Sequence, residues 1–172
     1  FEYPNDRWLA RFAARERQPA YDPAVGFVDR TSLRRYNPEI VFSPRPKNSR
    51  IVRRWVFRND DEIITDLHNR PVTKIWETQF QVDFQSDDTI AYHLLPTYER
   101  LEDDFEISRG VILPKGNEYN FLRHSFRINT ASRRVVSVST NYTVGPFYSG
   151  RARDLTVNIG IRPRRGILIN LS

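Results

Sequence analysis

The sequence of 172 residues contains no cysteine and no methionine, and only 7 glycines. The absence of cysteine excludes a disulfide-stapled domain and a zinc-thiolate protein. No stretch approaches the ~18 apolar residues of a membrane-spanning helix, so the sequence does not predict a helical membrane protein. Aromatic residues make up 13% and hydrophobic residues 39% of the chain, which is unlike the composition of a disordered polypeptide.

The length fits one domain, which we expect to span residues 1–172. The chain starts at Phe1 without a methionine and ends in 166–172, a segment with the character of a strand. We therefore expect it to be a piece of a longer protein. The formal net charge is +6, and the cations are 24 arginines and 3 lysines. Such a bias suits cations that pair with carboxylates, because the planar guanidinium offers several donors.

Hydrophobic and polar residues alternate with a period of two over four long segments, which predicts strands with one apolar and one polar face. These segments are 76–84, 122–129, 136–144 and 154–162. Less regular segments at 31–44, 51–57 and 89–101 are also predicted as strands, the last with a bulge at Pro96. Residues 6–16 fit either a strand or a helix, and we favour a strand because the rest of the chain is β.

Short and long connections alternate along the chain. Short polar turns are predicted at 45–49, 85–88, 130–134 and 163–166. Longer loops are predicted at 18–29, 59–71, 102–119 and 145–151. A meander places all the turns at one end and all the loops at the other, as in outer-membrane barrels. Segments of roughly 9 to 13 residues also have the length that a tilted strand needs to cross a bilayer.

We therefore predict an all-β fold, an antiparallel up-and-down (meander) β-barrel of the outer-membrane type with about eight or nine long strands, either complete or part of a larger barrel. Aromatic residues near predicted strand ends would form its interfacial girdles. They are Trp8, Tyr36, Trp55, Trp76, Tyr92, Tyr98, Tyr119, Phe121, Tyr142, Phe147 and Tyr148. The alternative is a soluble β-sandwich or barrel that binds carbohydrate or another ligand. In that fold Phe80, Val138 and Val157 are buried together in one interior. His124 on an apolar strand face argues against lipid contact, unless it lies near an interface.

Several motifs occur in the order and spacing of a known family. They are 21–30 (YDPAVGFVDR), 43–46 (SPRP), 98–101 (YERL), 105–107 (FEI), 110–116 (GVILPKG), 145–151 (GPFYSGR) and 162–163 (RP). Through them the chain resembles a bacterial family of unknown function. That family forms the C-terminal outer-membrane-type β-barrel of envelope proteins with an N-terminal family-nine-like carbohydrate-binding module. The module and a terminal aromatic residue are absent from this sequence.

The resemblance implies a barrel in the bacterial outer membrane with no established enzymatic activity. We expect it to act as a pore, a transporter-like barrel or a surface anchor, linked to glycan binding or uptake. Its expected partners are outer-membrane lipid, glycans and other envelope proteins. Candidate contacts at the barrel mouth come from two predicted loops: Tyr21, Asp22, Phe27, Arg30, Phe147 and Tyr148. A purely structural interpretation of the first loop is also open. In it, Pro23 and Gly26 shape a tight loop and the side chain of Phe27 packs inward.

Motifs of enzymes and of cofactor or nucleotide sites are absent from the sequence, so we predict no enzyme and no cofactor. The three histidines, His68, His93 and His124, are far apart and indicate no metal site. Carboxylates cluster at 60–62 and 102–104 in predicted loops, without the spacing of an EF-hand. The arginines are spread along the chain rather than gathered in one stripe, so we expect no nucleic-acid partner.

Overall fold

The computed structural model describes residues 1–19, 32–164 and 167–171, and within this part every regular element is a strand. The strands are β1 (Glu2–Pro4), β2 (Trp8–Arg17), β3 (Leu33–Phe42), β4 (Val52–Asp66), β5 (Pro71–Phe84), β6 (Thr89–Arg100), β7 (Phe105–Ser108), β8 (Val111–Leu113), β9 (Glu118–Asn129), β10 (Val136–Phe147), β11 (Gly150–Arg164) and β12 (Ile167–Leu171). The predicted all-β class is confirmed, and residues 8–17 form a strand rather than a helix.

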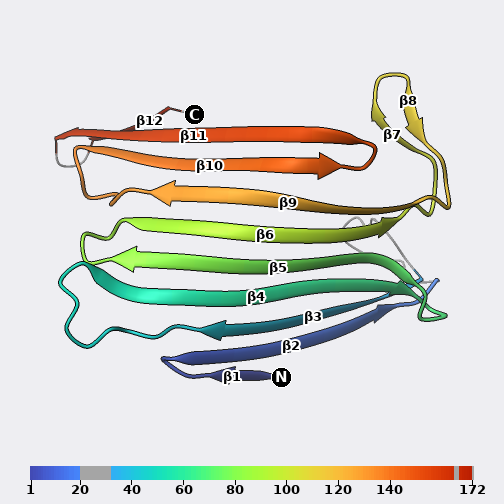
Figure 1. Ribbon diagram of the computed structural model, residues 1–172, viewed down its shortest axis with the longest axis horizontal. Helices are drawn as coiled ribbons and strands as arrows, with labels where there is room; N and C mark the ends of the chain where they lie inside the picture. The colour runs from blue at the N-terminus through green and yellow to red at the C-terminus, as the bar shows by residue number, and fades with distance from the viewer. Residues whose placement is uncertain (20–31, 165–166, 172) are drawn as a thin grey trace.

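Ten strands form one antiparallel sheet in the order β1-β2-β3-β4-β5-β6-β9-β10-β11-β12 (Figure 1). Each strand therefore pairs with its neighbours along the chain, apart from the β7–β8 hairpin inserted between β6 and β9. The predicted meander is confirmed. Eight of the strands have 10 to 15 residues, while β1 and β12 are short.

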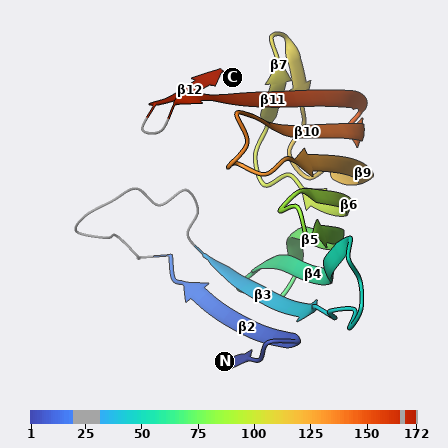
Figure 2. The same cartoon turned by 90° about the vertical axis from the view of Figure 1, so that its left-hand side faces the viewer.

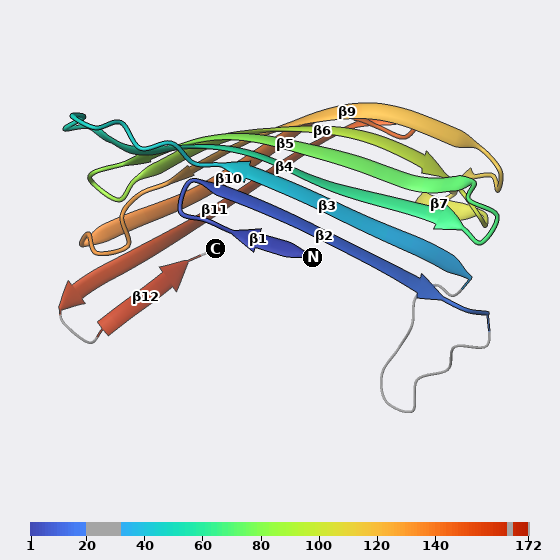
Figure 3. The same cartoon turned by 90° about the horizontal axis from the view of Figure 1, so that it is seen from below.

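The sheet is a single curved layer. Seen along its strands it forms an open arc, with β1 and β2 at one end of the arc and β11 and β12 at the other (Figure 2). Figure 3 shows the same arch from a second direction. Among the described strands, no pairing joins β1 to β12, so this part of the chain is not closed into a barrel.

Two connections predicted as long loops are tight turns. β4 continues to Asp66, so residues 59–66 are strand and only residues 67–70 form the turn before β5. The carboxylates of 60–62 consequently lie within a strand. β10 and β11 are joined by Tyr148 and Ser149 alone, with Tyr148 at a φ of 50°. The strict alternation of short and long connections was therefore wrong, because polar residues at these positions belong to strand faces.

The bulge predicted at Pro96 is also absent. β6 pairs with β9 without interruption from Thr89 to Arg100, and Pro96 faces Leu122. The ladder with β5 has no pairs at Leu95 and Pro96 but keeps the same offset on both sides. A proline lacks the backbone N–H donor, and the sheet tolerates this loss at Pro96, where the ladder with β5 has no pairs.

Close contact between β9 and β10 depends on Gly145. Its φ is 152°, and a Cβ at this position would lie 2.6 Å from the carbonyl oxygen of Leu122 and 2.9 Å from the Cα of Arg123. Both atoms belong to the backbone and have little room to move. A glycine is thus required for β10 to lie this close to β9.

The hydrophobic core is small. Its one cluster of buried apolar residues in the described part of the chain is Leu33, Ile64 and Val72, at one end of β3, β4 and β5. The long apolar rows predicted from the sequence are not part of it. They lie on one open face of the sheet, which is described next.

Candidate functional site

The strand register aligns one apolar side chain from each of eight successive strands. Trp8 faces Phe42, which faces Phe57, and the row continues through facing positions in β5, β6, β9, β10 and β11. The remaining members are Phe80, Tyr92, Phe126, Tyr142 and Leu155. We call the face that carries this row the apolar face. Its side chains are exposed to an unusual degree: Phe57 is 42%, Phe80 is 44% and Leu155 is 65% exposed.

The opposite face carries polar and charged side chains, and we call it the polar face. Its members include Arg11, Glu39, Arg58, Asp60, Gln79, Gln81, Asp83, His93, Ser125, Asn141, Thr143 and Asp154. Several of them are buried, with Asp83 only 1% and His93 3% exposed. Side chains crowd together on the inside of an arc and spread apart on its outside. The polar face is accordingly the concave one, and the apolar face is convex.

Glu39 is the centre of an ion-pair network on the polar face. Its carboxylate accepts a hydrogen bond from Arg11 on β2 at 3.0 Å and lies 2.8 Å from the guanidinium of Arg58 on β4. Arg58 also contacts Asp60 at 2.7 Å, and Arg11 contacts Glu2 at 3.3 Å. Each buried charge therefore has partners on neighbouring strands, which offsets the loss of hydration.

A second chain of contacts runs along β5. Gln79 donates to Gln81 at 2.6 Å, and Gln81 donates to Asp83 at 2.6 Å. The other carboxylate oxygen of Asp83 accepts from Arg54 on β4 at 2.6 and 2.9 Å. Alternate residues of one strand share a face, so these side chains lie in a line. Amides and charges are thus joined in one continuous network.

His93 and the hydroxyls beside it complete the polar face. The His93 Nδ1 lies 2.6 Å from a carboxylate oxygen of Glu77, while its Nε2 is buried without a partner among the described residues. On β9 and β10, Ser125 donates to Asn141 at 3.0 Å and accepts from Thr143 at 3.1 Å. Among all the residues that the structure describes, no three histidine, aspartate or glutamate side chains lie close enough together to hold a metal ion.

Some polar residues on the apolar face find partners within it. Thr78 donates to the side-chain oxygen of Asn59 at 3.0 Å. The Nδ1 of His124 lies 2.7 Å from the hydroxyl of Tyr92, and the two rings stack with centroids 6.0 Å apart. His124, whose place on an apolar face argued against lipid contact, therefore has its hydrogen bond supplied by the neighbouring strand.

Four of the predicted mouth contacts, Tyr21, Asp22, Phe27 and Arg30, lie outside the described residues. The other two lie together in an aromatic cluster at the end of the sheet beside β7. Phe147 and Tyr148 have ring centroids 4.9 Å apart. Their neighbours in the cluster are Phe105, Tyr119 and Phe121. Tyr148 occupies the two-residue turn between β10 and β11, not a long loop.

Sequence reasoning identified neither the network of Glu39 and Asp83 nor the His93 dyad. Their cross-strand partners Arg11, Arg54 and Glu77 lie 28, 29 and 16 residues away in the sequence. The available signal was the mixture of arginine, carboxylate and amide on the polar faces, which indicated ion pairing without naming the pairs. The girdle prediction was also wrong in part, because Trp76 and Tyr142 lie well inside β5 and β10 rather than near their ends.

Comparison with known proteins gives no match to a family model, to a curated protein or to a solved structure. The described residues include no helix with the length and apolar character needed to cross a bilayer.

Proposed function

We propose that the chain forms part of the wall of a β-barrel in a bacterial outer membrane, where the barrel acts as a pore, a transporter-like channel or a surface anchor. Its apolar face contacts the acyl chains of the lipid, and its polar face lines a wet lumen. The observation that carries this proposal is the row from Trp8 to Leu155, which is exposed on the convex side of the arc.

Exposure of the large apolar side chains supports this orientation. A soluble sheet turns its apolar face toward a second layer and its polar face toward water. Here no second layer covers the apolar face in the described part of the chain, and Phe80 and Val157 are 44% and 38% exposed. The soluble alternative requires these two residues and Val138 to share a dry interior. Exposed apolar surface of this extent is favourable when it contacts lipid.

The charges of the polar face fit a lumen in the same way. A charged side chain that faces lipid near the bilayer midplane costs about 2–4 kcal/mol for arginine or lysine. On the polar face Arg54, Arg58 and Arg123 are paired with Asp83, Glu39 and Asp154. The pairs also reach across strands, so they hold the wall together while water fills the remaining space.

Two single-cysteine variants test the orientation. The chain has no cysteine, so Phe80→Cys and Gln81→Cys each introduce one labelling site on opposite faces of β5. In vesicles, we expect a lipid-soluble maleimide to label position 80 and not position 81. Thr78→Cys, on the same face as Phe80, is the matched control and should also be labelled. Labelling of 81 but not of 80 and 78 contradicts the proposal.

A further inference from the structure

We propose that the end of the sheet carrying the turns after β3 and β5 binds an anionic phospholipid, with its phosphate among the arginines there and an acyl chain in an aromatic groove. This inference rests on the proposed function, since it assigns the lipid that the apolar face contacts. It is argued from the groove, from the cations beside it and from the charge of the turns.

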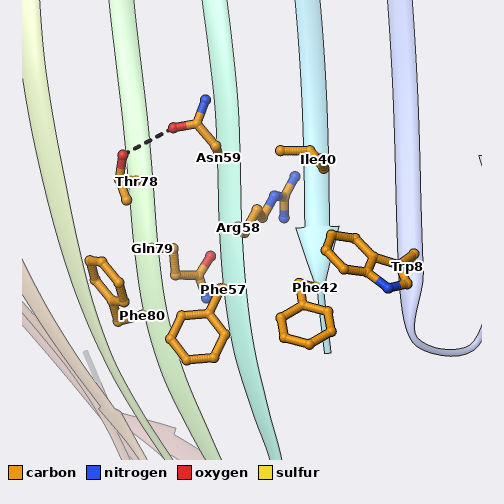
Figure 4. Close-up of a pocket in the computed structure, with 9 residues that line it drawn as sticks. All are labelled: Trp8, Ile40, Phe42, Phe57, Arg58, Asn59, Thr78, Gln79 and Phe80. Atoms are coloured by element: carbon orange, nitrogen blue, oxygen red, sulfur yellow. Dashed lines mark hydrogen bonds between the residues drawn. The ribbon is translucent and has the colours of Figure 1, made fainter. Parts of the chain in front are cut away.

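A shallow groove of about 190 Å³ crosses the apolar face over β2 to β5 (Figure 4). Aromatic rings line one side of it in an unbroken series. Trp8 and Phe42 have centroids 4.3 Å apart, Phe42 and Phe57 6.2 Å, and Phe57 and Phe80 5.9 Å. Ile40 closes the side above Trp8. The row of rings gives this side of the groove an apolar surface that suits a hydrocarbon chain.

One cation stands beside the groove at its turn end, and others lie in and next to the turn that follows β3. The guanidinium of Arg7 lies 5.3 Å from the centroid of the Phe42 ring. The segment that follows Phe42 is held there, since the N–H of Ser43 donates to the carbonyl of Arg7 at 2.8 Å. Arg45, in that segment, lines a second hollow of about 330 Å³ together with Arg53 and Arg54. An aromatic row bordered by arginines is the arrangement expected at a membrane interface.

The turns at this end carry an excess of positive charge. The connections 5–7, 43–51, 85–88 and 130–135 contain six cations and three acids, a net charge of +3. At the opposite end, the connections 67–70, 101–117 and 148–149 contain three cations and four acids, a net charge of −1. The two groups lie at opposite ends of the sheet in Figure 1.

Charge complementarity therefore selects a negatively charged headgroup over a zwitterionic one. Each lysine or arginine near an anionic surface strengthens the attraction about fivefold. Arginine also binds a phosphate with two parallel hydrogen bonds. Arg45 and Arg53 pair with the exposed residues Asp6 and Asp87 and remain 56% and 45% exposed, so they are accessible to a headgroup. Arg54 is engaged by the buried Asp83.

The test compares lipid retention. The full chain is reconstituted into vesicles of phosphatidylcholine with or without phosphatidylglycerol, and lipids that remain bound after extraction are measured by native mass spectrometry. We expect about a tenfold preference for phosphatidylglycerol, the effect of one to two cations. The double variant Arg45→Gln/Arg53→Gln should lose this preference. The matched control Arg109→Gln/Lys115→Gln, at the opposite end, should keep it.

A second measurement covers the case in which the double variant does not fold. The preference of the unmodified chain should fall as salt is added, because salt screens exposed charges. Insertion into both vesicle types with equal retention of the two lipids overturns the lipid inference and leaves the proposed function intact. Failure to insert into either vesicle type overturns the proposed function and the lipid inference with it.

Discussion

Glu39 illustrates, at the scale of single residues, how the polar face accommodates buried charge. Its side chain is 8% exposed and lies between Arg11 and Arg58, which are themselves partly exposed. A buried carboxylate with two guanidinium partners is stable only while both remain in place. Removing its charge leaves two arginines facing one another across β3 without an anion between them.

Glu39→Gln should lower the free energy of unfolding in vesicles by about 1–2 kcal/mol, less than for a fully buried pair because both arginines are partly exposed. Urea unfolding followed by tryptophan fluorescence measures the change. Glu2→Gln is the matched control, since Glu2 also binds Arg11 but is 51% exposed. A smaller loss is expected for it. Equal losses for the two variants contradict a special role for the buried network.

Contacts between turns act at the scale of secondary-structure elements. Asp88, in the turn between β5 and β6, accepts a hydrogen bond from the hydroxyl of Ser86 at 2.6 Å and from the N–H of Ala131 at 2.8 Å. Arg134 donates to the same carboxylate at 2.6 Å. Ala131 and Arg134 belong to the turn between β9 and β10. The two turns are thereby joined beside the ladder of β6 and β9.

These contacts give stability a defined pH dependence. The hydroxyl of Ser86, then the N–H of Ala131 and the charge of Arg134, lower the pKa of Asp88 below its usual value. The contribution of Asp88 is therefore complete above the unfolded pKa of about 3.9 and is lost as the pH falls through the lower folded pKa. Asp88→Asn should be less stable than the unmodified chain at neutral pH.

The difference between the two proteins should disappear at the acid end of a series of urea unfolding curves measured from neutral to low pH. Asp103→Asn is the control, because Asp103 is 90% exposed and lies on the β7–β8 insertion. It should unfold like the unmodified chain throughout. A stability difference for Asp88→Asn that persists unchanged into strong acid contradicts the assignment.

On the scale of the whole molecule, the single layer leaves its largest side chains without cover. Trp8, Trp55 and Trp76 all lie on the apolar face and are 45%, 42% and 38% exposed. The cluster of Leu33, Ile64 and Val72 is too small to replace the burial that a second layer provides. Under the proposed function, the bilayer supplies the missing apolar contact.

Tryptophan fluorescence should report this contact directly. In vesicles whose acyl chains carry bromine, which quenches indole on contact, we expect emission to fall strongly relative to vesicles of the unbrominated lipid. A water-soluble quencher should have little effect in either vesicle. The opposite result, with quenching from water and none from the acyl chains, contradicts contact between the apolar face and lipid.

The sequence by itself determined the strands and their two faces. Alternation with a period of two needs only local backbone geometry, so segments such as 76–84 and 136–144 were predicted as strands and are strands. Connections were predicted less well. A polar residue such as Asp60 is easily predicted to lie in a loop, because the sequence alone does not reveal that it belongs to a polar strand face and pairs with Arg58.

Only the tertiary structure decided which faces meet and which way they point. Register depends on pairing between distant segments, and it alone aligns Trp8 with Leu155 in one row and brings Arg58 to Glu39. Periodicity is the same whether an apolar face turns inward or outward. Burial in the folded sheet tells the two faces apart, since Phe80 and Leu155 on the apolar face are 44% and 65% exposed while Asp83 and His93 on the polar face are 1% and 3% exposed.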